Sequence, residues 1–239
     1  MASEYDDITA FHYASYRPPL HRNILTSCLN RKSFTSGLDI GCGTGQSTIA
    51  LADFCSTVVG IDPSTDMISN GITYPNVSYS LFNKSQIYFD ANSFDIITLA
   101  GSLWYAKSQK LLDEIVRVGA NNSSVLVYDF QVLLNDILTK LGFQAKEDSN
   151  GYNHQENFAG LKTRMIDKLS EGCERIRFQM TAQELAHMVL SVKEQYQFFE
   201  GLYGFQEVYN TTVEKINAIS NSKSYAIEAD TFFISYRLK

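Results

Sequence analysis

Three glycines within five residues, at positions 41, 43 and 45, constrain this chain more than any other feature. They follow the apolar stretch Leu38-Asp39-Ile40 and precede a helical pattern at 46–54, so they mark a strand-to-helix turn. Glycine adopts positive φ without steric cost and lets a ligand approach the backbone closely. Turns of this kind carry the ligand sites of open α/β sheets. The segment therefore predicts an α/β fold with a binding site at this turn.

The rest of the chain alternates between strand and helix patterns, which supports that fold class. Short apolar or β-branched runs predict strands, and amphipathic runs between them predict helices. The expected strands are 38–40, 57–61, 77–82, 94–100 and 124–130, and the expected helices are 46–54, 107–118 and 132–141. Such alternation predicts a doubly wound, mostly parallel sheet with helices on both faces.

Outside this alternation the pattern is less regular. Two short helices, broken at Pro18-Pro19, are expected before residue 30, and a strand is expected at 175–180. Thr181 and Glu184 predict a capping box that starts a helix at 181–190; its His187 is expected to face solvent. A last strand at 231–238 is expected to join the sheet edge in antiparallel direction.

These elements are interpreted as one domain, 1–239. It would consist of a helical N-terminal cap (1–36), a ligand-binding core (37–141), an insert or lid before the sixth strand (142–172) and a C-terminal part that completes the sheet (173–239).

Composition excludes several classes of protein. Hydrophobic residues make up 44 % of the chain, which argues against disorder, and the net charge of −6 offers no basic face for nucleic acid. The four cysteines lack metal-ligand spacing, so no metal is expected. The acidic start and the absence of an apolar run long enough to span a bilayer predict a cytoplasmic protein without membrane contact.

The spacing of the glycines argues against a dinucleotide. A dinucleotide fingerprint reads G-x-G-x-x-G, whereas Gln46 occupies its third glycine position here. Asp62 follows the next strand about 20 residues on, where a carboxylate accepts bonds from ribose hydroxyls. Asp39, beside the turn, suits a ligand with a positive group. A nucleoside with a cationic end, S-adenosylmethionine, fits both carboxylates.

The same residues carry a family resemblance. The chain resembles class I S-adenosylmethionine-dependent methyltransferases, in particular the small-molecule branch that includes trans-aconitate methyltransferase. The similar segments are YASYRP (13–18), LDIGCGTGQST (38–48), GIDPSTDMI (60–68), SFDIITLAGSLWY (93–105), EIVRV (114–118) and VLVYDF (125–130). The resemblance implies a Rossmann-like seven-stranded sheet with an antiparallel last strand.

The resemblance also implies a role for each matching residue. The glycines would cradle the amino-acid and ribose parts of the cofactor, Asp39 would help to hold its ammonium side through backbone or water, and Asp62 would take the ribose hydroxyls. The remaining cofactor-binding positions are Tyr13, Arg17, Pro63, Met67, Asn83, Lys84, Ser85 and Ala100. Arg17 would clamp the methionine carboxylate, Pro63 and Met67 would lie under the adenine, and residues 83–85 would bind its edge.

The acceptor side is less defined. Tyr16, Trp104 and Tyr105 are the predicted substrate-pocket residues, and Leu103 stands where relatives usually carry histidine. His154 is the best candidate for a general base, although a loop histidine without a catalytic task is the interpretation that the sequence favours. The segments 5–17 and 142–170 are expected to close over the site as lids.

Two functions remain open. The preferred one is methyl transfer to a small-molecule acceptor. Few acid–base residues accompany the motifs, which favours an acceptor that is already ionised, such as a carboxylate. The alternative is a non-catalytic protein, or a partner subunit, that binds S-adenosylmethionine or S-adenosylhomocysteine.

Overall fold

The structure is a computed structural model that describes residues 7–16, 18–30, 32–83, 86–144, 151–220 and 223–239. The chain divides into two compact units. The core unit comprises Pro19–Gln131, Tyr152–Glu174 and Thr231–Lys239. The helical unit comprises Met1–Pro18, Val132–Gly151 and Arg175–Asp230.

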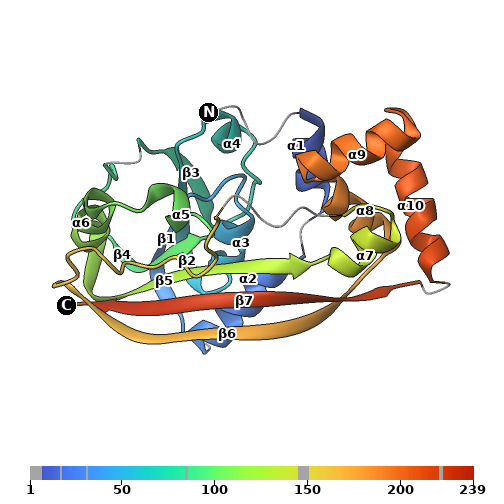
Figure 1. Cartoon of the computed structure of the whole chain (residues 1–239). Helices are drawn as coiled ribbons and strands as arrows, with labels where there is room; N and C mark the ends of the chain where they lie inside the picture. Colours follow the sequence, from blue (N-terminus) through green and yellow to red (C-terminus); the bar gives the residue numbers. More distant parts are fainter. Residues whose placement is uncertain (1–6, 17, 31, 84–85, 145–150, 221–222) are drawn as a thin grey trace. The chain divides into compact units, whose positions relative to one another are not determined.

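A seven-stranded sheet confirms the predicted fold class (Figure 1). Its order is β3-β2-β1-β4-β5-β7-β6, and β1 to β5 pair in parallel. The strands are β1 (Phe34–Ile40), β2 (Cys55–Asp62), β3 (Val77–Leu81), β4 (Phe94–Ala100), β5 (Gly119–Leu133), β6 (Ile166–Met180) and β7 (Tyr225–Leu238). β6 and β7 are neighbours that run antiparallel. Side-chain hydrogen bonds join Ser170 to Ser235 and Arg175 to Asp230, so the residue number rises along one strand as it falls along the other.

The sheet differs from the sequence prediction at its far edge. The last strand, β7, lies between β5 and β6 instead of at the edge, and β6 is the edge strand. β6 also begins at Ile166, inside the segment predicted as insert or lid. Most of its side chains are exposed and many are charged. Edge strands carry such residues because charge discourages pairing with another chain. This composition concealed the first part of β6, whereas the strand predicted at 175–180 forms its second part.

Helices cover both faces of the sheet in the core unit. On one face, α2 (Leu20–Leu29) and α3 (Gln46–Ala52) pack with Val58, Ile96 and Leu126. On the other face, α5 (Leu103–Ala106) and α6 (Gln109–Val118) pack with a second group of strand residues, Leu38, Ile40, Leu99, Val125 and Val127. The short α4 (Thr65–Ser69) contacts β2 and β3. Because β1, β2 and β4 are parallel, the loops that follow their carboxyl ends lie at the same edge of the sheet.

The helical unit has its own apolar core. It contains α1 (Asp7–Ser15), α7 (Asn135–Lys140), α8 (Ala182–Leu190), α9 (Lys193–Tyr203) and α10 (Val208–Ile219). The predicted capping box at Thr181 and Glu184 is present at the start of α8. The sequence did not predict α10, where only Val208, Thr212 and Ile216 are buried.

One histidine prediction in this unit is wrong. His187 is half-buried instead of facing solvent, and its Nδ1 lies 2.9 Å from Nδ1 of His12 on α1. The pattern of apolar residues along α8 could not reveal this partner, because His12 lies 175 residues away in the sequence.

Within the described residues, no helix is both long and apolar enough to cross a bilayer.

Candidate cofactor and substrate site

The glycine turn between β1 and α3 has the backbone that its sequence predicts. Gly41, Gly43 and Gly45 all adopt positive φ, at 75°, 55° and 99°. The N–H groups of Gly41 and Cys42 donate to the carbonyl of Ile61, at 2.7 and 3.1 Å, and so tie the turn to β2. The turn is therefore held in place by the sheet itself.

The glycines differ in what surrounds them. A side chain at Gly41 would overlap Ser102, and one at Gly45 would overlap the hydroxyl of Tyr79. A Cβ at Gly43, in contrast, would meet nothing within 4 Å. The turn is closed on its protein side and open at Gly43, as a cradle for a ligand would be.

Asp39 lies fully buried beneath this turn. Its carboxylate accepts hydrogen bonds from the hydroxyls of Ser47, Thr48 and Thr98, at 2.5, 2.8 and 2.8 Å. Burial raises the pKa of this carboxyl group, against the effect of those three hydrogen bonds. The side chain therefore ties the first turn of α3 to β4, and only its backbone is left for the predicted contact with a ligand.

Asp62 lies at the end of β2 with its carboxylate at the open part of the turn. It accepts hydrogen bonds from the N–H groups of Gly43, at 3.0 Å, and Ser64, at 2.9 Å. A carboxylate has about four lone-pair positions, so two remain for hydroxyl donors. Ser64 also caps α4, which carries the half-buried Met67, while Pro63 is exposed.

The predicted adenine-edge residues lie in the loop after β3. The exposed Asn83 donates to the hydroxyl of Tyr88, at 2.7 Å, and accepts from the N–H of Gln86, at 2.9 Å. The side chain of Asn83 thus holds the loop in this conformation. Lys84 and Ser85 lie outside the described residues.

The end of β4 and the helix after it carry three more predicted positions. Ala100 is half-buried as the last residue of β4 and pairs with Tyr128 of β5. Trp104 and Tyr105 on α5 are exposed, and their rings lie 5.7 and 5.8 Å from that of Tyr152. They form a cluster of three aromatic rings above the end of β4.

His154 has a partner that the sequence interpretation missed. Its Nδ1 lies 2.8 Å from the carboxylate of Asp129, which follows Tyr128 on β5. The hydroxyl of Tyr152 lies 2.9 Å from the same carboxylate oxygen and 2.9 Å from the carbonyl of Gly101. The usable signal was the acidic residue in VLVYDF, which follows the partner of Ala100 and so lies beside the end of β4.

The N-terminal positions belong to the helical unit. Tyr16 packs partly buried against its apolar core, and burial, with Glu184 nearby, raises the pKa of its phenol to about 12. Arg17 and the side chain of Tyr13 lie outside the described residues. The roles of these three residues, and the closing of segments 5–17 and 142–170 as lids, stay predictions.

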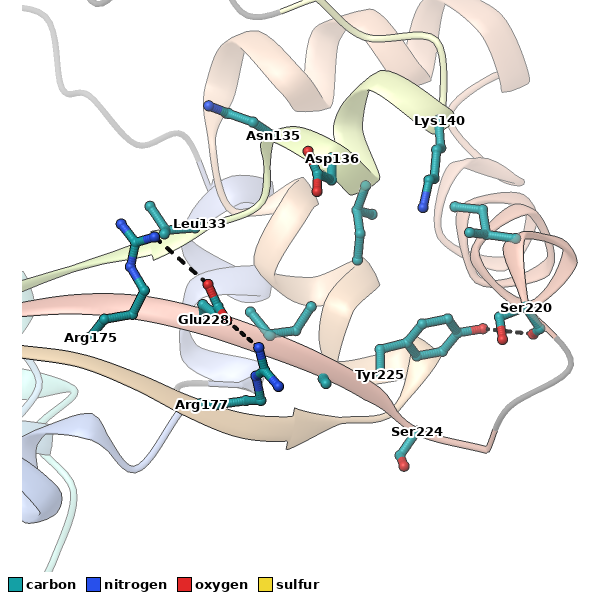
Figure 2. A pocket seen from close by; sticks show the side chains of 14 residues that line it. Leu133, Asn135, Asp136, Lys140, Arg175, Arg177, Ser220, Ser224, Tyr225 and Glu228 are labelled. Atoms are coloured by element: carbon teal, nitrogen blue, oxygen red, sulfur yellow. Dashed lines mark hydrogen bonds and ion pairs between the residues drawn. The ribbon is translucent and has the colours of Figure 1, made fainter.

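Figure 2 shows a pocket of about 890 Å³ in the helical unit. Arg175 and Arg177 point toward Glu228 of β7, at 3.8 and 2.5 Å. Arg175 also pairs with Asp230 of the same strand, at 2.7 Å. None of the predicted site residues lines this pocket, so it is not the site that the sequence indicates.

Comparison with known proteins agrees with the geometry of the turn. Residues 38–127 match the family model described as "Methyltransferase domain". A putative methyltransferase of Dictyostelium discoideum is 28 % identical over 125 residues, covering 51 % of this chain and 47 % of that protein. A demethylmenaquinone methyltransferase of Shouchella clausii is 29 % identical over 102 residues, covering 38 % and 43 %. This chain thus spans less than half the length of these two relatives.

A solved structure extends the likeness of the fold to nearly the whole chain. It is that of a putative type II methyltransferase from Anaeromyxobacter dehalogenans, with a TM-score of 0.61 at 17 % identity, covering 93 % of this chain and 97 % of that one. Residues 38–127 thus resemble methyltransferase domains in sequence, and the solved structure extends this likeness as a likeness of fold.

Proposed function

We propose that this chain is an S-adenosylmethionine-dependent methyltransferase whose acceptor is a small molecule. One observation carries the proposal: the Asp62 carboxylate, with two lone-pair positions to spare, lies against the open glycine turn at Gly43. A ribose diol supplies the two donors that this carboxylate lacks. The residues therefore fit the cofactor that the domain's family uses.

The chain's own residues would divide the work as follows. Bound S-adenosylmethionine supplies a methyl group on a cationic sulfur. Asp62 would hold the ribose, Gly41, Gly43 and Gly45 would let the ligand lie on the backbone, and Met67 and Pro63 would line the adenine side. The carbonyl of Ala100 would face the methionine part. Rigid placement of methyl donor and acceptor in line is the main contribution that such a site makes to the rate.

The finer parts of this proposal have separate support. A small-molecule acceptor is favoured over nucleic acid because the net charge is −6. The likeness to the trans-aconitate branch rests on the sequence segments alone, and a cytoplasmic location on the composition. The alternative, a binding protein or partner subunit without turnover, would use the same turn and the same Asp62.

Replacing Asp62 tests the cofactor site. We expect Asp62→Ala to weaken binding of S-adenosylhomocysteine by about 2–3 kcal/mol, the scale of hydrogen bonds to a charged group. Calorimetric titration measures the dissociation constant, with Asp66→Ala, an exposed neighbour on α4, as the matched control. NAD should give no heat of binding to either variant or to the parent protein. An unchanged dissociation constant in Asp62→Ala contradicts the ribose assignment.

Turnover is tested separately. S-Adenosylmethionine labelled in its methyl group is incubated with the protein and a metabolite extract, and the label is followed into acceptors. Incorporation supports the methyltransferase, whereas tight S-adenosylhomocysteine binding without any incorporation supports the binding-protein alternative.

A further inference from the structure

We infer that His154 is the general base of this reaction, positioned by Asp129 and Tyr152, and that the acceptor carries a dissociable proton on the atom to be methylated. The inference rests on the proposed methyltransferase function. It departs from the expectation of a carboxylate acceptor. That expectation rested on the scarcity of acid–base residues near the motifs, and the structure supplies such a pair in His154 and Asp129.

The cluster is physically continuous with the glycine turn. The hydroxyl of Ser102 donates to the carbonyl of Ile40, at 2.5 Å, and a side chain at Gly41 would overlap Ser102. The preceding residue, Gly101, has φ of +66°, and a Cβ there would lie 3.1 Å from the Asp129 carboxylate. Two consecutive residues after β4 thus separate the cofactor turn from the Asp129 side chain.

His154 is held from three sides. Besides its bond to Asp129, its ring stacks on that of Phe232, with a centroid distance of 5.8 Å and an interplanar angle of 17°. The ring of Tyr152 meets it edge-on at 4.7 Å. The alternative interpretation treats His154 as a surface loop histidine without a task. These three contacts argue against it, because such a residue needs no fixed ring orientation.

The free nitrogen of this imidazole is available for chemistry. No described residue bonds to Nε2, and the side chain borders a pocket of about 200 Å³. Since Asp129 accepts from Nδ1–H, the neutral ring carries its lone pair on Nε2. The exposed rings of Trp104 and Tyr105 beside Tyr152 add an apolar surface for a planar acceptor.

The proton and electron balance is simple. The acceptor's X–H bond breaks and its proton goes to Nε2 of His154, while the electron pair left on X forms the bond to the methyl carbon. The bond between that carbon and sulfur breaks, and its electron pair stays on sulfur. The imidazolium is stabilised by the Asp129 carboxylate and afterwards releases its proton to water.

The role of Asp129 predicts a change that can be observed without any acceptor. Its second carboxylate oxygen accepts from the N–H of Phe130, at 2.8 Å. In Asp129→Asn the amide oxygen keeps that bond, so the NH₂ group faces His154. We expect the imidazole proton to move from Nδ1 to Nε2, which nitrogen-15 NMR of the ring detects as an exchange of the two nitrogen shifts. An unchanged tautomer would overturn the positioning role.

Two activity measurements complete the test. His154→Gln keeps a side chain that can bond to Asp129 but has no base, and we expect its rate of label incorporation to fall at least about 100-fold, the low end of general-base contributions. Affinity for S-adenosylhomocysteine should not change in this variant. Lys110→Ala, an exposed change on α6, serves as the control at full rate.

The products identify the acceptor class. Alkali releases methanol from methyl esters but not from methyl ethers, N-methyl or C-methyl products. We expect the label to be alkali-stable. Alkali-labile label, or a His154→Gln variant at the parent's rate, overturns the inference while leaving the methyltransferase intact. A parent protein that incorporates no label contradicts the proposed function itself, even if the NMR result confirms the pair.

Discussion

Gly45→Ala should lower the free energy of unfolding by about 3 kcal/mol or more and abolish cofactor binding. The residue has φ of 99°, and a non-glycine residue in left-handed backbone costs about 1–2 kcal/mol. Its new Cβ would also overlap Tyr79, whose hydroxyl is fixed by a bond to the carbonyl of Ile72, at 2.9 Å. Overpacking of this kind costs about 1–3 kcal/mol more. Urea denaturation followed by circular dichroism measures the loss.

Gly43→Ala is the matched control. Its φ is also positive, at 55°, but its Cβ would meet no atom within 4 Å. We expect it to cost only the backbone penalty of about 1–2 kcal/mol. The double variant Gly45→Ala/Tyr79→Ala should recover part of the loss, because the overlapping ring is gone. If Gly45→Ala and Gly43→Ala destabilise the protein equally, the overlap with Tyr79 does not contribute to the requirement for glycine at position 45.

The contrast between these glycines shows how far a sequence can be interpreted alone. The pattern of glycines after Leu38-Asp39-Ile40 was enough to predict the strand, the turn and the carboxylate at the next strand end. It could not distinguish Gly43 from Gly45, because the difference lies in Tyr79, a residue brought in by β3. Local spacing thus predicts conformation, and only the tertiary fold gives the contacts.

Two further misses have the same physical origin. Asp129 and His154 are 25 residues apart in the chain and meet only because the loop that carries His154 returns to Asp129 of β5. The edge strand β6 carries Lys168, Glu171 and Glu174 in its exposed first half, and alternation with so little burial is too weak to detect. In both cases the information lies in how distant segments pair, which no local pattern contains.

The His12–His187 pair should make the protein sensitive to acid. Burial, and the nearby His187, lower the pKa of His12 from 6.5 to about 4, and burial also lowers the pKa of His187. The groups that face His12 are His187 and the rings of Phe11, Tyr196 and Tyr209. No carboxylate is among these neighbours to stabilise a second proton.

The sign of the effect follows from proton binding. Between pH 6.5 and about 4 the unfolded chain takes up a proton at His12 that the folded chain refuses, so acid favours unfolding. The stabilisation is complete above the unfolded pKa and is lost as the pH falls toward the folded one. The difference between the pKa of His12 in the unfolded chain, 6.5, and in the folded chain, about 4, corresponds to about 3 kcal/mol in the free energy of unfolding. Asp39 does not add to this loss, because its raised pKa makes the folded chain bind a proton more readily in acid.

His12→Gln removes the titrating ring and should flatten the pH dependence. We expect the free energy of unfolding of the parent protein to fall by about 3 kcal/mol between pH 7 and about 4, and that of the variant to fall much less. Urea titrations at half-unit pH steps measure both curves. Parallel curves would show that the acid sensitivity arises elsewhere. A flattened curve would identify the contact between α1 and α8, joined by these two rings, as the source of the acid sensitivity.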